Sequence, residues 1–209
     1  MNGSPSRPLS KDDMYALFDA LSERLRRKRA RANIHVVGGC AMALAYARER
    51  ITRDIDARID AGHGALIEAV QEIAAEQGLA ANWLNDQAAS AIPKPPDTRA
   101  RTLYATEYLV VTGASPEHML AMKLEAGRGR DMNDIAALVR MLGIASPDEG
   151  VAIHRRLLPH SKKNPHGLMK QALGSQAQPD AATRETQRGA VHADRTTNAT
   201  SQDTNPDRA

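Results

Sequence analysis

The stretch VGGCAMALAYARERITRDIDARI, from Val37 to Ile59, decides the fold predicted for this chain. An apolar strand runs into the glycine pair Gly38-Gly39, and a helix-forming segment follows. A second strand then alternates apolar and polar residues and carries Asp54 and Asp56 one residue apart. Because alternate residues of a strand point to the same face, the two carboxylates are expected on one side of the sheet.

This pattern favours a site for a nucleotide and its metal ion. A glycine turn lets the backbone come close to an anion, and the helix start near Cys40 offers free N–H groups to phosphate oxygens. Two carboxylates on one face, Asp54 and Asp56, are suitable ligands for Mg²⁺, which prefers oxygen donors and bridges to phosphates. The alternative is an ordinary turn followed by solvated aspartates beside Arg53 and Arg58. Cys40 itself is interpreted as a small buried residue, not as a nucleophile.

The rest of the chain predicts a mixed α/β (α+β) fold, with a small mixed sheet flanked by helices and a helical C-terminal part. A serine cap, acids in the first turn and basic residues in the last mark the first helix. The helices are expected at residues 10–31, 40–49, 65–79, 115–128, 131–143 and 147–158, and the strands at 34–38, 51–59, 103–104 and 108–111. The domain is expected to span residues 10–160. Residues 161–209 contain few large apolar side chains and are expected to be a disordered tail, with one short helical stretch at HGLMKQAL.

Composition narrows the class of protein. The chain has 209 residues, a net charge of +3 and a single cysteine, which excludes an internal disulfide and favours the cytoplasm. No apolar run is long enough to cross a membrane, so no membrane partner is expected. The run RLRRKRAR, from Arg24 to Arg31, is either a basic helix end or a patch for RNA phosphates.

A resemblance follows from these motifs. The stretch from Val37 to Ile59 resembles the signature of the polymerase-β-type nucleotidyltransferase superfamily. The segment SPEHMLAMKLEAGRGRDMNDIAALVRML, from Ser115 to Leu142, resembles AbiE-type abortive-infection toxins and an uncharacterised nucleotidyltransferase-like branch close to them. The WLND at Trp83–Asp86 is similar to that branch as well. The resemblance covers residues 33–142 and implies the nucleotidyltransferase fold.

The resemblance also implies roles for individual residues. It places the triphosphate on the glycine turn and on a lysine whose charge steadies the leaving pyrophosphate, with one or two acids beside that lysine. The catalytic residues that it implies are Asp54, Asp56, Lys123, Asp131 and Asp134; the nucleotide-binding residues are Gly38, Gly39 and Lys123; the metal ligands are Asp54 and Asp56. The alternatives are that Lys123 is an exposed surface lysine and that Asp131 only caps a helix.

The implied function is Mg²⁺-dependent transfer of a nucleoside monophosphate from a nucleoside triphosphate to an RNA (such as tRNA) or protein acceptor. The AbiE-type branch adds a role as the toxin of a toxin–antitoxin or phage-defence system, with an antitoxin as partner. Two departures from the superfamily favour an alternative, a non-catalytic nucleotide-binding or regulatory protein with the same fold. Gly39 replaces a common serine, and a third metal-binding carboxylate on a later strand is not obvious. Glu107, just before the strand at 108–111, is the best candidate for it. A dinucleotide-binding module is a further alternative, although GGCAMA is not G-x-G-x-x-G.

Overall fold

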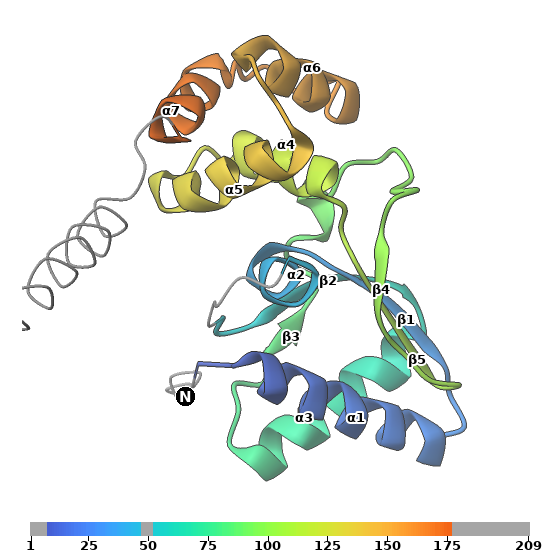
Figure 1. The fold of residues 1–209 in the computed structure, drawn as a ribbon. Coiled ribbons are helices and arrows are strands. Elements are labelled where there is room, and N and C mark those ends of the chain that lie inside the picture. The colour runs from blue at the N-terminus through green and yellow to red at the C-terminus, as the bar shows by residue number, and fades with distance from the viewer. Residues whose placement is uncertain (1–7, 47–51, 177–209) are drawn as a thin grey trace, which may run out of the picture.

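The computed structural model describes residues 8–46 and 52–176, and they form the mixed α/β fold that the sequence predicts (Figure 1). The helices are α1 (Lys11–Arg27), α2 (Gly38–Ala45), α3 (His63–Gln77), α4 (Pro116–Ala126), α5 (Met132–Leu142), α6 (Pro147–Leu157) and α7 (His166–Gln176), with 3₁₀ turns η1 (Ala89–Ala91) and η2 (Gly129–Asp131). The strands are β1 (Ala32–Val36), β2 (Ile55–Ala61), β3 (Leu84–Asn85), β4 (Arg101–Ala105) and β5 (Leu109–Gly113).

The five strands form one mixed sheet in the order β3-β2-β1-β5-β4. β1 pairs with β2 antiparallel and with β5 parallel, while β3 joins β2 parallel and β4 joins β5 antiparallel. Because β1 and β5 are parallel, their carboxyl ends lie at the same edge, where the Ala114 N–H donates to the Val36 carbonyl at 3.0 Å. This edge therefore gives rise to two connections, the glycine turn into α2 and the short link into α4.

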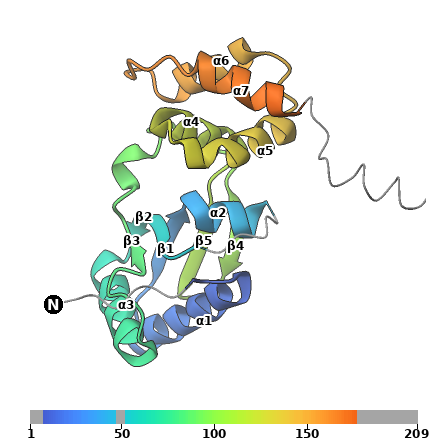
Figure 2. The same cartoon turned by 90° about the vertical axis from the view of Figure 1, so that its left-hand side faces the viewer.

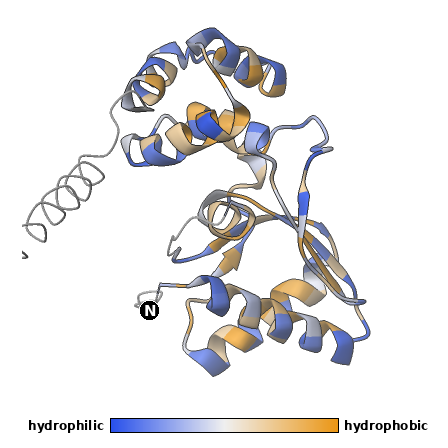
Figure 3. Ribbon diagram, in the orientation of Figure 1, coloured by the Kyte–Doolittle hydropathy of each residue, from blue (hydrophilic) through white to orange (hydrophobic). Residues whose placement is uncertain are grey.

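Apart from α2, which packs on the sheet, the helices form two groups. α1 and α3 lie side by side against the sheet, and α4 to α7 form a second group beyond the edge where β1 and β5 end (Figures 1 and 2). Each helix of the second group carries both hydrophobic and hydrophilic residues, as Figure 3 shows. α5 and α6 bury one side, whereas α4 is buried over most of its length. One continuous core joins the groups, and its members include Phe18 of α1, Ile34 of β1, Leu120 of α4 and Met169 of α7. No helix in the described part of the chain is long and apolar enough to cross a membrane.

Local signals account for most helix boundaries. Ser10 and Asp13 form a reciprocal capping box at the start of α1, and Ser115 caps α4 by accepting from the His118 N–H. β2 differs from expectation because it begins at Ile55 and not at residue 51, which leaves Asp54 in the bend before the strand. The expected helix over 40–49 ends as α2 at Ala45, and residues 47–51 lie outside the described part.

The ordered chain continues past residue 160. α7 places Met169 and Ala172 in the core at 0% exposure, and Met169 packs against Gly150 of α6. α7 thus lies beyond the predicted boundary at 160/161 and packs on α5 and α6 through Met169, Ala172 and the partly buried Leu168 and Leu173. The short helical stretch predicted at HGLMKQAL is this helix. Residues 177–209 of the expected tail lie outside the described residues.

The basic end of α1 is neutralised within the molecule. Arg24 pairs with Glu72 and Glu76 of α3, and Lys28 pairs with Glu68 and Glu72 at 3.0 and 2.9 Å. Arg26 and Arg27 both contact Glu23 on their own helix, at 2.7 and 2.9 Å. This pairing favours the helix-end interpretation of the run from Arg24 to Arg31 over the RNA-binding one.

Candidate active site

A pocket of about 630 Å³ lies where the sheet edge faces α4 and η2. It is the place at which the two connections from the carboxyl ends of β1 and β5 meet. Six of the site residues predicted from the sequence line it together: Gly38, Gly39, Asp54, Asp56, Lys123 and Asp131. Thr52 and Arg53 line it as well. Two segments that are far apart in the sequence, the one around the glycine turn and the one around α4, therefore form one site.

The glycine turn forms the wall of the pocket beside the carboxylates. Gly38 has a φ of +64°, a left-handed conformation that glycine adopts without strain, and a Cβ there would lie 3.1 Å from the Asp56 Oδ2. A Cβ on Gly39 would lie 2.9 Å from the Thr52 hydroxyl oxygen. That hydroxyl donates to the Asp54 carbonyl at 2.9 Å, so it also shapes the bend that presents Asp54. The turn thus has no room for side chains, and α2 begins directly at the pocket.

The two aspartates both line the pocket but differ in environment. Asp54 is exposed in the bend, whereas Asp56 lies half-buried on β2, in register with Asn85 of β3. Burial raises the pKa of Asp56, and the neighbouring negative charge of Asp54 raises it further, while Asn85 and Arg128 act in the opposite direction. A cation between the two carboxylates would relieve both causes of this shift. Two carboxylates on an open pocket fit Mg²⁺, which takes its remaining ligands from water and phosphate oxygens.

Lys123 is buried, and this excludes the alternative of an exposed surface lysine. It is 7% exposed, and its ammonium group contacts the Asp131 Oδ1 and the Asp134 Oδ2, each at 2.8 Å. Asp131 and Asp134 are themselves 7% and 1% exposed. Asp131 directly precedes α5, yet its side chain makes no capping hydrogen bond and turns to Lys123 instead. The structure thus brings together the three residues that the resemblance placed side by side.

Glu107 is not a third carboxylate of this site. It lies in the turn before β5, at the opposite end of that strand from the pocket, and pairs with Arg31 at 2.8 Å on the surface. Within residues 8–46 and 52–176, no group of three or more His, Cys, Asp or Glu side chains could hold a metal ion. Cys40 is fully buried, and burial raises the pKa of its thiol, as expected for a structural residue.

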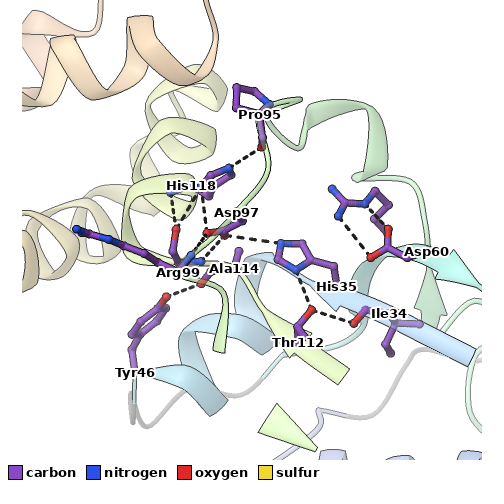
Figure 4. A network of polar contacts seen from close by, with 12 residues as sticks. Ile34, His35, Tyr46, Asp60, Pro95, Asp97, Arg99, Thr112, Ala114 and His118 are labelled. Atoms are coloured by element: carbon purple, nitrogen blue, oxygen red, sulfur yellow. Dashed lines mark hydrogen bonds and ion pairs between the residues drawn. The ribbon is translucent and has the colours of Figure 1, made fainter. Parts of the chain in front are cut away.

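A polar network behind the pocket fixes the start of α4 against the sheet (Figure 4). The Asp97 carboxylate accepts from the Ser115 N–H at 2.7 Å and lies 3.5 Å from the His118 Nδ1. His35 of β1 contacts the Thr112 hydroxyl of β5 at 3.0 Å, and its Nε2 faces Asp97 at 3.9 Å. Burial lowers the pKa of His35, and the charge of Arg58 lowers it further. Because α4 carries Lys123, this network also sets where the lysine lies.

The sequence interpretation missed three residues that belong to the site. Arg128 and Arg130 line the pocket from the turn between α4 and α5, although they were noted only as letters of a motif. Asn85 of β3 lies beside Asp56 and was part of the WLND segment. Their positions in the pocket follow from contacts between distant parts of the chain. The only signal in the sequence is that they belong to the WLND segment and to the 115–142 segment.

Comparison with protein families gives one result. A family model described as "Nucleotidyltransferase of unknown function (DUF6036)" matches residues 12–142, from α1 through α5. The chain belongs to this family. The match includes both halves of the pocket, and it supports the nucleotidyltransferase superfamily and a general function in nucleotidyl transfer. Comparisons with curated proteins and with solved structures give no match.

Membership of this family implies a nucleotide substrate, and nucleotidyltransferases in general use a divalent metal ion. The match does not extend to the AbiE-type branch, which stays a prediction.

Proposed function

We propose that the protein is a Mg²⁺-dependent nucleotidyltransferase that moves a nucleoside monophosphate from a nucleoside triphosphate to an RNA or protein acceptor. The observation that supports it best is the convergence of Gly38, Asp54, Asp56 and Lys123 on one open pocket. Family membership supports the general reaction. The non-catalytic alternative keeps one supporting observation, because no third carboxylate accompanies the two aspartates in the described residues.

In the proposed reaction, an acceptor hydroxyl attacks the α-phosphorus, loses its proton, and the bond from that phosphorus to the bridging oxygen of pyrophosphate breaks. Asp54 and Asp56 would hold Mg²⁺, which supplies charge neutralisation and orientation at the α-phosphate. The N–H groups at the start of α2 and the open glycine turn would receive phosphate oxygens. The Lys123 ammonium directs two of its three N–H groups at Asp131 and Asp134, which leaves one for a phosphate oxygen.

The biological setting is part of the same proposal. The likeness of the 115–142 segment to AbiE-type toxins favours transfer to RNA, such as tRNA, or to a protein, in the cytoplasm where triphosphates are available. The same likeness favours control by an antitoxin. The paired cations of α1 argue against that helix as the docking surface for an RNA acceptor. An acceptor would reach the reacting phosphate through the open mouth of the pocket.

The test is incubation of the full chain with each α-labelled nucleoside triphosphate, Mg²⁺ and either total RNA or protein lysate. Label transferred to macromolecule is expected for one or more triphosphates, and Asp54→Asn or Asp56→Asn should abolish it. Asp60→Asn is the matched control, because Asp60 lies on the same strand, pairs with Arg58 at 2.6 Å and does not line the pocket. Nucleotide binding without any labelled product would favour the non-catalytic alternative.

A further inference from the structure

The charge balance around Lys123 leaves that lysine with little positive charge to offer a triphosphate. One ammonium group contacts two carboxylates at 2.8 Å, so this buried cluster of Lys123, Asp131 and Asp134 carries a net negative charge when all three are ionised. Such a cluster holds its ammonium in place but does not attract a polyanion. Together with Asp54 and Asp56, the pocket has more acids than Lys123 can balance. Lys123 can offer at most its third N–H to a phosphate oxygen, so the β- and γ-phosphates need further cationic groups.

Arg128 and Arg130 have the position and the free charge that this requires. Both line the pocket, both are exposed, and neither makes an ion pair with any residue in the described part of the chain. Arg24, Arg31 and Arg58, by contrast, each pair with a glutamate or aspartate. Arg53, next to Asp54, lines the pocket as well. The charge of Arg128 already acts on the carboxylate of Asp56. Two guanidinium groups thus line the pocket without an ion pair to any other described residue.

The turn that carries the two arginines is held rigidly. It begins at Gly127, which ends α4 with a φ of +64°, and the Asp131 N–H closes it by donating to the Arg128 carbonyl at 2.9 Å. Asp131 is in turn held by Lys123. The buried ion pair therefore anchors the end of the turn, and Arg128 and Arg130 project from a fixed backbone. Such preorganisation favours binding, because little conformational entropy is lost in the backbone when the ligand arrives.

We infer that Arg128 and Arg130 form the subsite for the β- and γ-phosphates of the nucleotide, and that Lys123 positions this subsite through Asp131. The inference rests on the proposed function and adds to it. Planar guanidinium groups bind phosphate oxygens in pairs of charge-assisted hydrogen bonds, which a lysine engaged by two carboxylates does not. The subsite recognises the polyphosphate and not the base, so its affinity is independent of which triphosphate the protein uses.

The experiment measures binding of inorganic tripolyphosphate and of each nucleoside mono- and triphosphate, all with Mg²⁺, by calorimetry. Arg128→Gln and Arg130→Gln are each expected to weaken tripolyphosphate and triphosphate binding by about 10- to 100-fold, the range for hydrogen bonds to charged groups. Monophosphate binding should change little. Arg140→Gln is the matched control, because Arg140 is an exposed arginine of α5 outside the pocket. All three variants should melt close to the wild type, since exposed side chains contribute little to stability.

The outcomes separate this inference from the proposed function. Triphosphate binding by the wild type that neither arginine variant weakens would overturn the subsite and leave the proposed function standing. Loss of RNA binding with unchanged tripolyphosphate binding would also overturn it, because the arginines would then serve the acceptor. If the wild type binds none of these probes, the proposed function fails and the subsite fails with it. Weakened tripolyphosphate binding without any labelled transfer product would support the subsite and count against catalysis alone.

Discussion

Removal of the Lys123 charge should destabilise the protein strongly. In Lys123→Met the side chain keeps its length but loses the ammonium group, and Asp131 and Asp134 stay buried at 7% and 1% exposure without that cation. Breaking a buried ion pair by removing one partner costs about 3–5 kcal/mol, because the remaining charge is desolvated and uncompensated. For a chain of this size, each kcal/mol corresponds to roughly 2–4 °C in melting temperature, so the loss should be roughly 6–20 °C.

The assay is urea and thermal unfolding of the nucleotide-free protein. Lys170→Met is the control, because Lys170 is an exposed lysine of α7 and should change the free energy of unfolding by less than about 0.5 kcal/mol. Adding Asp131→Asn and Asp134→Asn to Lys123→Met removes the uncompensated charges and should restore most of the lost stability. A Lys123→Met protein that unfolds like the Lys170→Met control would refute the reasoning, since the lysine would then behave as a solvated side chain.

Three further predictions concern separate parts of the structure. Burial raises the pKa of Asp56, so between the pKa of the unfolded chain and that of the folded protein only the folded protein holds the proton. The free energy of unfolding therefore falls as the pH rises through this range. Asp56→Asn should therefore raise the melting temperature of the nucleotide-free protein at neutral pH, and Asp54→Asn should raise it less, because it relieves only the repulsion and not the burial of a charge. Met169→Ala should cost about 2–5 kcal/mol in urea unfolding, because its side chain is fully buried. Gly39→Ser should lower both the melting temperature and triphosphate affinity through contact with Thr52, and Thr52→Ala should relieve much of the loss.

Each of these has a result that would contradict it. Equal melting temperatures of the Asp54 and Asp56 variants across the pH range would show that burial does not distinguish the two carboxylates. A Met169→Ala protein as stable as the wild type would mean that α7 is not part of the cooperative fold. No recovery in the Gly39→Ser, Thr52→Ala double variant would place the strain elsewhere in the turn.

Features that depend on neighbouring residues alone could be predicted from the sequence. The caps at Ser10 and Ser115, the stop at Gly143 and the conformational demand at Gly38 depend on a few neighbouring residues, and the structure confirms them. The order of strands and helices through α6 was likewise readable from apolar periodicity, apart from the two-residue β3. A strand that short carries no periodic signal.

Features that depend on contacts between distant parts of the chain could not be predicted from the sequence. The pattern around Lys123 indicated only that its helix face is partly apolar, while its burial depends on Asp131 and Asp134 folding back from α5. α7 was undervalued because its few apolar residues stabilise it only once α5 and α6 are present. Glu107 was predicted as a metal ligand because the sequence indicates strand β5 but not its direction relative to β1. The parallel pairing of the two strands puts Glu107 at the end away from the pocket.

The parallel pairing of β1 with β5 has a consequence for when the site can form. Ala32 pairs with Leu109, and Val36 pairs with Gly113, so these contacts close a long loop that contains α2, β2, α3 and β4. Closing such a loop costs conformational entropy before the strand contacts form and offset it. Pairing of strands that are distant in sequence is therefore a slow step of folding. Arg128 and Arg130, and the acids Asp131 and Asp134 that follow them, can reach the glycine turn only after this step. A chain still emerging from the ribosome therefore has no complete pocket until η2 and α5 have been synthesised and have left the ribosome.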